Sequence, residues 1–176
     1  MSTSPEIPLR QGDVLAGKYR VERVLGHGGM GVVVAATQLD LGRLVALKFL
    51  LTGMSQPDVV ARFLREARIV GGLRSEHVAR VYELGQLENG AHYMAMEHLE
   101  GADLAALLAQ RGPFDFSEAA AIVRQACEAV AEAHESGVVH RDLKPGKFVF
   151  YAATERRTID QGLGFWHLQE LDGERR

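Results

Sequence analysis

The most specific stretch of this chain is His140-Arg141-Asp142-Leu143-Lys144-Pro145, a polar loop between two apolar segments, residues 138–139 and 148–151. The apolar segments predict short strands on either side of the loop. Upstream, residues 102–110 and 117–136 are rich in alanine and predict two helices. The order of residues in the loop is too specific to be a chance product of composition.

The first hundred residues predict a small antiparallel sheet with one helix. Short apolar runs joined by turns lie at residues 19–25, 32–37, 44–50, 78–87 and 91–99. Such runs favour an antiparallel sheet, because parallel strands need long crossover segments. Between the third and fourth runs, residues 57–73 place apolar side chains at helical spacing with arginines between them, which predicts an amphipathic helix. The predicted fold is therefore α+β, with a five-stranded first part.

A glycine-rich segment, GHGGMG, joins the first two predicted strands and contains Gly26, Gly28 and Gly31. Without Cβ atoms, these residues let the backbone approach a phosphate closely and adopt dihedrals that other residues resist. The GxGxxG pattern also opens dinucleotide-binding folds, but there a helix follows it, whereas here the next residues predict a strand. An ordinary hairpin turn remains the alternative interpretation of this segment taken alone.

Lys48 ends the run Val45-Ala46-Leu47-Lys48, where a charged side chain is costly unless it is paired. Glu66, on the predicted amphipathic helix, is an available partner. A lysine held by such a glutamate is a fixed cation for phosphate oxygens. Two alternatives remain open: Lys48 as an edge-strand charge turned to solvent, and Glu66 as part of a solvated face with Arg62 and Arg65.

Taken together, these motifs resemble the protein kinase family. The glycine segment, the Lys48 strand, the helical Glu66 and the loop at residues 140–145 follow one another in that family's order. Lys144, two places after Asp142, resembles the serine/threonine branch. The resemblance covers residues 19–163 and is greatest to bacterial members of the family.

The resemblance implies a protein-kinase-like organisation of the chain. Residues 1–16 would form a flexible leader. Residues 17–100 would form the small, nucleotide-binding lobe, with five antiparallel strands and one helix. Residues 101–176 would form an incomplete, mainly helical large lobe that carries a remnant of the catalytic loop.

It also implies an ATP site. Gly26, Gly28 and Gly31 would cover the phosphates. Lys48 would contact the α and β phosphates, and Glu66 would orient Lys48. The residues implied around the adenosine are Met96 behind the adenine, Glu97 to Leu99 as the hinge, Asp103 at the ribose, and Val33, Ala46 and Val149 on the two faces of the adenine ring.

For catalysis, the resemblance implies that Asp142 accepts the proton of a substrate hydroxyl and that Lys144 steadies the transferring phosphoryl group. Two departures from the family pattern weaken this expectation. Lys147 stands where the family has an asparagine that binds magnesium, and its ammonium repels a divalent cation. Gln161 replaces the aromatic residue of the Asp-Phe-Gly motif. Asp160 keeps that motif's carboxylate, although an ordinary loop aspartate is its alternative, so we expect one Mg²⁺ ion at most.

The sequence after Gly162 contains no Ala-Pro-Glu segment and no further predicted helix. We therefore expect much of the apolar side of residues 117–136 to be uncovered, either as a liability for aggregation or as a surface for a protein partner.

Composition excludes several classes of protein. A net charge of -3 gives no reason to expect nucleic acid or an anionic membrane as a partner. Cys127 is the only cysteine, so no intrachain disulfide can form, and no long apolar run is present. We expect a cytoplasmic protein.

The sequence therefore predicts a protein serine/threonine kinase-like domain that binds ATP, with phosphotransfer impaired or lost. Two alternatives remain: a pseudokinase scaffold that binds a partner without nucleotide, and a gene fragment without a function of its own.

Overall fold

The computed structural model describes residues 9–28, 31–50, 56–137, 139–140, 143–152 and 161–165. These residues form two compact units. The first lies within Met1–Ala67 and Arg80–His98, and the second within Arg68–Ala79 and Leu99–Arg176. One helix, α1 (Pro57–Gly72), contributes residues to both units. No helix in the described part of the chain is long and apolar enough to cross a membrane.

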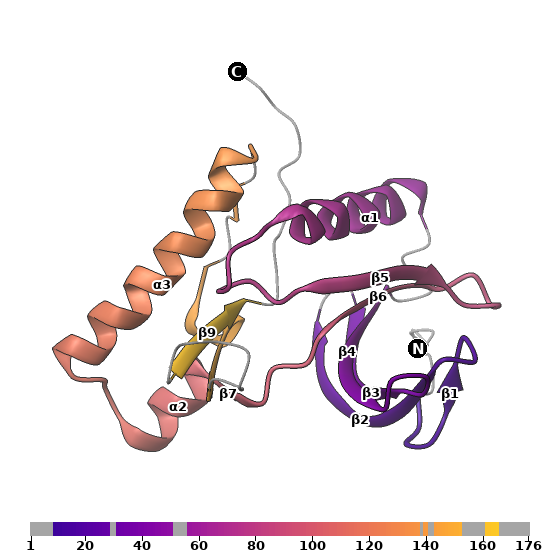
Figure 1. Ribbon diagram of the computed structural model, residues 1–176, viewed down its shortest axis with the longest axis horizontal. Helices are drawn as coiled ribbons and strands as arrows, with labels where there is room; N and C mark the ends of the chain where they lie inside the picture. The colour runs from indigo at the N-terminus through magenta and orange to yellow at the C-terminus, as the bar shows by residue number, and fades with distance from the viewer. Residues whose placement is uncertain are drawn as a thin grey trace, which may run out of the picture. The chain divides into compact units, whose positions relative to one another are not determined.

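The first unit is built on a six-stranded antiparallel sheet with the strand order β1-β2-β3-β4-β6-β5 (Figure 1). Its strands are β1 (Val14–Leu15), β2 (Tyr19–Gly28), β3 (Gly31–Gln38), β4 (Arg43–Leu50), β5 (Val81–Gln86) and β6 (His92–Glu97). The five predicted strands are all present. Their bounds differ from the predicted ones by a few residues, because apolar runs locate strands better than they locate strand ends.

The sixth strand, β1, corrects the expectation of a loose leader as far as residues 9–16 are concerned. Leu15 pairs with Tyr19 in β2, and the Val21 N–H donates to the carbonyl of Asp13. Gly17, at φ +65°, makes the tight turn between the two strands. Leu9 and Leu15 pack on the core of the sheet, so apolar burial orders a segment whose composition predicts none.

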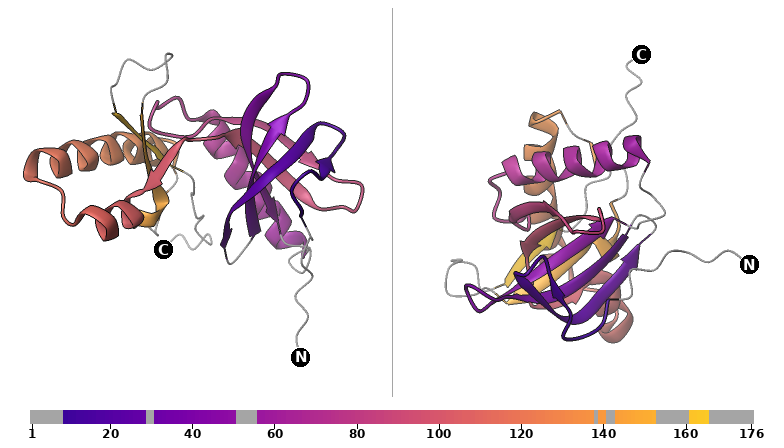
Figure 2. Two further views of the ribbon diagram at one scale, coloured as in Figure 1. Left: turned by 90° about the horizontal axis from the view of Figure 1, so that it is seen from below. Right: turned by 90° about the vertical axis from the view of Figure 1, so that its right-hand side faces the viewer.

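The sheet curls strongly, as the two views in Figure 2 show. β3, β4 and β6 lie between β2 and β5 in the strand order, yet the Tyr19 hydroxyl in β2 donates to Glu83 in β5 at 3.1 Å. The curl encloses a core made by alternate residues of the strands. That core consists of Tyr19, Val21, Val32, Val34, Ala36, Val45, Leu47, Phe49, Tyr93 and Ala95.

The second unit contains two helices and a three-stranded sheet. Its elements are β7 (Gly101–Asp103), α2 (Leu104–Arg111), α3 (Phe116–Glu135), the short 3₁₀ helix η2 (Pro145–Lys147), β8 (Phe148–Ala152) and β9 (Gln161–Phe165). Both predicted helices are present. The first begins at Leu104 rather than at residue 102, because the Asp103 side chain accepts the Ala106 N–H and caps it.

Three parts of the second unit differ from the sequence-based expectation. β7 and β9 were not predicted. β7 has only three residues and β9 contains two glycines, so neither shows the sequence pattern of a strand. Val139 is not in a strand, and Val138 lies outside the described residues. The predicted strand at residues 148–151 is present as β8, between β7 and β9.

Helix α3 is only partly covered. An Asp115–Glu118 capping box starts the helix, and among its side chains only Ala129 and Ala133 are buried. Phe116 is 91% exposed and Val123 is 60% exposed. Ile122, Ala126 and Ala133 on α3 pack in the apolar core of this unit with Leu104 and Phe148. The expectation of a largely uncovered apolar side is therefore wrong for most of the helix and holds only at Phe116 and Val123.

Candidate functional site

The first unit contains a buried ion pair between β4 and α1. The Lys48 Nζ lies 2.8 Å from the Glu66 Oε1, and the two residues are only 5% and 7% exposed. The Phe63 ring, one helical turn before Glu66, has its centroid 5.8 Å from the same Nζ. Because β4 lies between β3 and β6 in the sheet, Lys48 is not an edge-strand charge, and neither residue faces solvent. Both alternatives left open by the sequence are thus excluded.

Strand register places three more predicted site residues on the face of the sheet that carries Lys48. Val33 pairs directly with Lys48 across β3 and β4, and Ala46 pairs with Met96 across β4 and β6. Side chains alternate along a strand, so Ala46 and Lys48 share one face while Leu47 points into the core on the other. Val33, Ala46, Lys48 and Met96 therefore line the side of the sheet opposite the apolar core.

The glycines of the GHGGMG segment differ in what they require. A Cβ at Gly31 would lie 1.9 Å from the carbonyl oxygen of Phe49, so the packing of β3 on β4 itself excludes a side chain. A Cβ at Gly26 would meet nothing within 4 Å. Neither residue has a positive φ, which corrects the expectation of unusual dihedrals at these two positions. Gly28 pairs with Gly31 at the end of β2, and Gly29 and Met30 lie outside the described residues.

Glu97, the first predicted hinge residue, is tied to the strand beside it by two hydrogen bonds. Its backbone N–H donates to the carbonyl of Arg80 at 2.8 Å, and its Oε2 accepts the Arg80 N–H at 3.2 Å. The end of β6 is thus fixed to the start of β5.

The second unit brings the other predicted adenosine residues together. Ala79 and Leu99 form a small buried cluster, and Val149 packs against it. Asp103 pairs with Val149 across β7 and β8, and its Oδ1 caps α2 at 2.9 Å from the Ala106 nitrogen. The sequence did not indicate that Ala79 packs with these predicted residues, because a lone alanine before a strand carries no signal. Each unit therefore assembles its own share of the predicted site.

The comparisons with known proteins agree with this geometry. Residues 19–166 match the model of the protein kinase domain. The chain belongs to the protein kinase family. It is 42% identical to the serine/threonine-protein kinase pkn3 of Myxococcus xanthus over 143 residues, which are 81% of this chain and 26% of that protein. PknE of Mycobacterium bovis is 40% identical over 148 residues, 84% of this chain and 26% of that protein. This kinase-family chain thus spans about a quarter of the length of these relatives.

Solved structures confirm the predicted protein-kinase fold. The crystal structure of the PknI kinase domain of Mycobacterium tuberculosis superposes with a TM-score of 0.72 at 30% identity and covers 89% of this chain and 61% of that one. The curled sheet and α1 correspond to a kinase small lobe, and the second unit corresponds to part of a large lobe. The bacterial serine/threonine kinases are the relatives that the sequence predicted.

The loop at residues 140–145 of this kinase-family chain is described only in part. His140 is buried at 1% exposure, whereas Lys144 is exposed and its carbonyl accepts the Lys147 N–H at the end of η2. Asp142 and Asp160, the predicted proton acceptor and metal ligand, lie outside the described residues. Within the described residues, no group of three or more acidic, histidine or cysteine side chains is placed to hold a metal ion.

Proposed function

We propose that this kinase-family domain binds ATP on the sheet face that carries Lys48. The observation that supports the proposal is the buried ion pair between Lys48 and Glu66, on the same face as Val33 and Met96. Burying two charges costs several kcal/mol per ion unless geometry compensates, so a buried pair is weak evidence for a role in stability alone. A lysine held at a fixed place by a glutamate is instead suited to bind phosphate oxygens.

The proposed contacts follow the family pattern. Lys48 binds the α and β phosphates, and the open space beside Gly26 accommodates the phosphate chain. Val33 and Ala46, on the same face as Lys48, provide apolar contacts for the adenine ring. The second unit carries the other residues that the family pattern assigns to the nucleotide: Leu99 and Val149, which pack with Ala79, and Asp103, whose Oδ1 caps α2.

We further propose that phosphotransfer to serine or threonine hydroxyls is impaired in this chain. Asp142 and Lys144 would keep their proton-accepting and phosphoryl-steadying roles. Magnesium would neutralise phosphate charge during transfer, and Asp160 is the carboxylate available to hold it. The half-buried Lys147, at the position of a metal-binding asparagine, fits a second ion poorly because like charges repel. Gln161 also lacks the apolar ring that stabilises the active arrangement.

Thermal unfolding with and without ATP tests nucleotide binding. ATP at a hundred times its dissociation constant should stabilise the fold by about 2.7 kcal/mol, which raises the melting temperature by several degrees. The Lys48→Ala variant should melt cooperatively and show no ATP shift. Because this variant leaves Glu66 buried without the Lys48 charge, the double variant Lys48→Met/Glu66→Leu serves as a folded control that also lacks the phosphate-binding cation. An equal ATP shift in all three proteins would contradict the proposed site.

A second candidate function is binding of a protein partner without nucleotide. The exposed apolar side chains of Phe116 and Val123 on α3 favour it, since exposed large apolar side chains are available to a partner. This candidate predicts a cooperative melt with no ATP shift. It also predicts that Phe116→Ser improves solubility, measured by light scattering, while leaving the melting temperature unchanged.

A further inference from the structure

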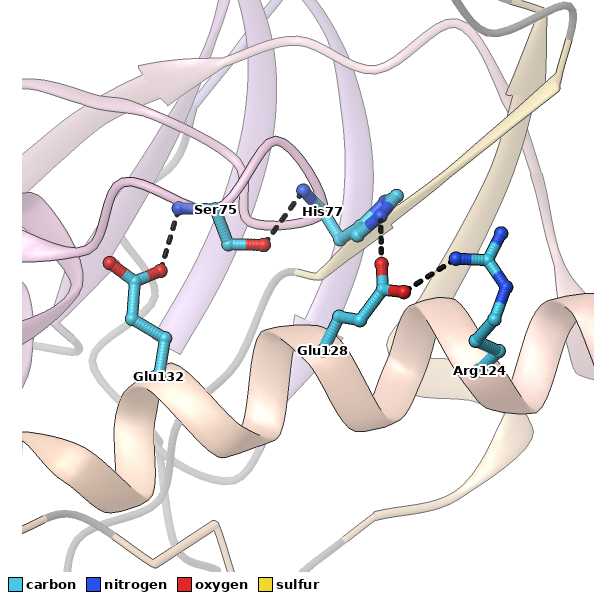
Figure 3. A network of polar contacts seen from close by, with 5 residues as sticks. All are labelled: Ser75, His77, Arg124, Glu128 and Glu132. Atoms are coloured by element: carbon cyan, nitrogen blue, oxygen red, sulfur yellow. Dashed lines mark hydrogen bonds and ion pairs between the residues drawn. The ribbon is translucent and has the colours of Figure 1, made fainter.

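The loop at residues 73–80, which joins α1 to β5, is held by a carboxylate of α3. The backbone N–H groups of Arg74 and Ser75 each donate to a different oxygen of Glu132, both at 2.6 Å. Figure 3 shows the bond from Ser75. These bonds are short and charge-assisted, and such bonds are about twice as strong as neutral ones. Glu132 thus satisfies two loop donors that no strand or helix ladder serves.

A second carboxylate, one helical turn earlier on α3, holds the same loop. The Nε2 of His77 lies 3.0 Å from the Glu128 Oε2, and Arg124 forms an ion pair with the other oxygen of Glu128 (Figure 3). His77 is 5% exposed, and its Nδ1 is buried without a hydrogen-bond partner among the described residues. Because a carboxylate oxygen only accepts hydrogen bonds, the His77 Nε2 carries a proton and donates it to Glu128.

The far end of this loop contacts the predicted adenosine residues. Ala79 packs against Leu99 and Val149, and Arg80 makes two backbone hydrogen bonds with Glu97. The near end continues directly from α1, the helix that carries Glu66. A loop fixed by α3 at residues 74–77 thus leads, within a few residues, to the hinge on one side and to the lysine-holding helix on the other.

We propose that Glu128 and Glu132 are positioning residues for nucleotide binding, which act by fixing the loop at residues 73–80. This inference rests on the proposed ATP site. Without the two carboxylates, the loop would lose its anchor, and the Arg80–Glu97 bonds and the Ala79 contact would hold the adenosine residues less firmly. ATP would then have to order these residues on binding, and its affinity would fall.

Glu132→Gln tests the proposal with the smallest change in shape, and Glu128→Gln is the second variant in case the first does not fold. Glu135→Gln, an exposed change at the end of the same helix, is the matched control. ATP affinity is measured by titration well below the melting temperature of every variant, so that loss of stability alone does not alter it. Hydrogen exchange without ATP reports on the loop directly.

We expect Glu132→Gln to speed amide exchange at Arg74 and Ser75 by about tenfold, the effect of losing roughly 1.4 kcal/mol of local stability. ATP binding should weaken by about threefold to tenfold in both variants and stay unchanged in Glu135→Gln. Faster exchange with unchanged ATP affinity would overturn the positioning role and leave only a structural contact. Absence of ATP binding to the unmodified chain would overturn the proposed function as well, so the two failures are distinguishable.

Discussion

A glutamate on the core side of the curled sheet and one on the opposite side have very different surroundings. On the core side, Glu83 lies at the rim, where it accepts hydrogen bonds from Tyr19, Tyr93 and Lys18. On the other side, Glu66 is buried and holds Lys48 at 2.8 Å. The rim carboxylate joins strands at modest cost, because water still reaches it. The buried Glu66 instead holds a charged lysine at a place where an apolar residue would cost less free energy. The core face thus stabilises the fold, whereas the Lys48 face is suited to bind a ligand.

Breaking the buried pair should have the largest effect on stability. Glu66→Ala removes the carboxylate beside Lys48 and leaves a charge in a poorly hydrated place, so the free energy of unfolding should fall by about 3 to 5 kcal/mol. Urea unfolding measures the change. The control is Lys48→Met/Glu66→Leu, which removes both charges and should unfold close to the unmodified chain. A loss below 1 kcal/mol for Glu66→Ala would show that solvent reaches the pair after all.

The two glycines at the ends of the GHGGMG segment sharpen the comparison. Gly31→Ala forces a Cβ against the Phe49 carbonyl, so we expect the free energy of unfolding to fall by about 3 kcal/mol. This value is at the upper end of the usual cost of overpacking. Gly26→Ala meets open space and should change the free energy of unfolding by less than about 0.5 kcal/mol. If the proposed site is right, Gly26→Ala weakens ATP binding without this loss of stability. Equal losses for the two variants, measured in urea, would contradict the geometry.

The hydrogen bonds to Glu83 at the rim should contribute less to the free energy of unfolding than the buried ion pair does. Tyr93→Phe removes the hydroxyl that donates to Glu83 at 3.0 Å, and a hydrogen bond to a charged group contributes about 1.5 kcal/mol. ATP affinity should not change, because Tyr93 points into the core on the opposite face from Lys48. Urea unfolding and ATP titration of the same variant check both parts of this expectation. A fall in ATP affinity would mean that the two faces are coupled.

The smallest expected effects are those of pH on the rim. The hydrogen bond from Lys18 holds the pKa of Glu83 below its usual 4.5, so its stabilisation is present above that pH and is lost as the pH falls through the lower folded-state value. Burial and the bond to Glu83 raise the pKa of Tyr93 from 10.0 to about 12. Its stabilisation is therefore present below pH 10 and is lost between pH 10 and about 12. Unfolding curves across pH, repeated with Tyr93→Phe, should show a reduced alkaline loss in the variant.

Much of this architecture was predictable, because its signals are local. Short apolar runs joined by turns located the strands, and the spacing of Phe63 and Ala67 located the face of α1 that is buried. The Lys48–Glu66 pair was predictable because a charge in an apolar strand demands a partner. The roles of these residues toward ATP, and a cytoplasmic location, stay predictions.

Other features were not predictable, because they depend on contacts between residues that are far apart in the sequence. Glu128 and Glu132 lie on a predicted helix whose sequence indicates no partner for them, yet they bind a loop more than fifty residues away. β1 and β9 are too short or too rich in glycine to show a pattern, and they exist because a neighbouring strand supplies hydrogen bonds. The reason for Gly31 is likewise visible only once β4 lies beside it.

The short strand β1 also has a consequence for the behaviour of the chain in solution. An open sheet edge offers rows of free N–H and C=O groups to any passing strand, and this is a common route to aggregation. Here Gly12 and Asp13 form hydrogen bonds with the C=O and N–H of Val21 in β2. The hydrogen bond from Tyr19 to Glu83 also brings β5, the other edge strand, close to β2. Removing residues 9–16 would thus expose the edge of β2 to pairing with strands of other molecules. These few residues should therefore lower the tendency of the first unit to aggregate.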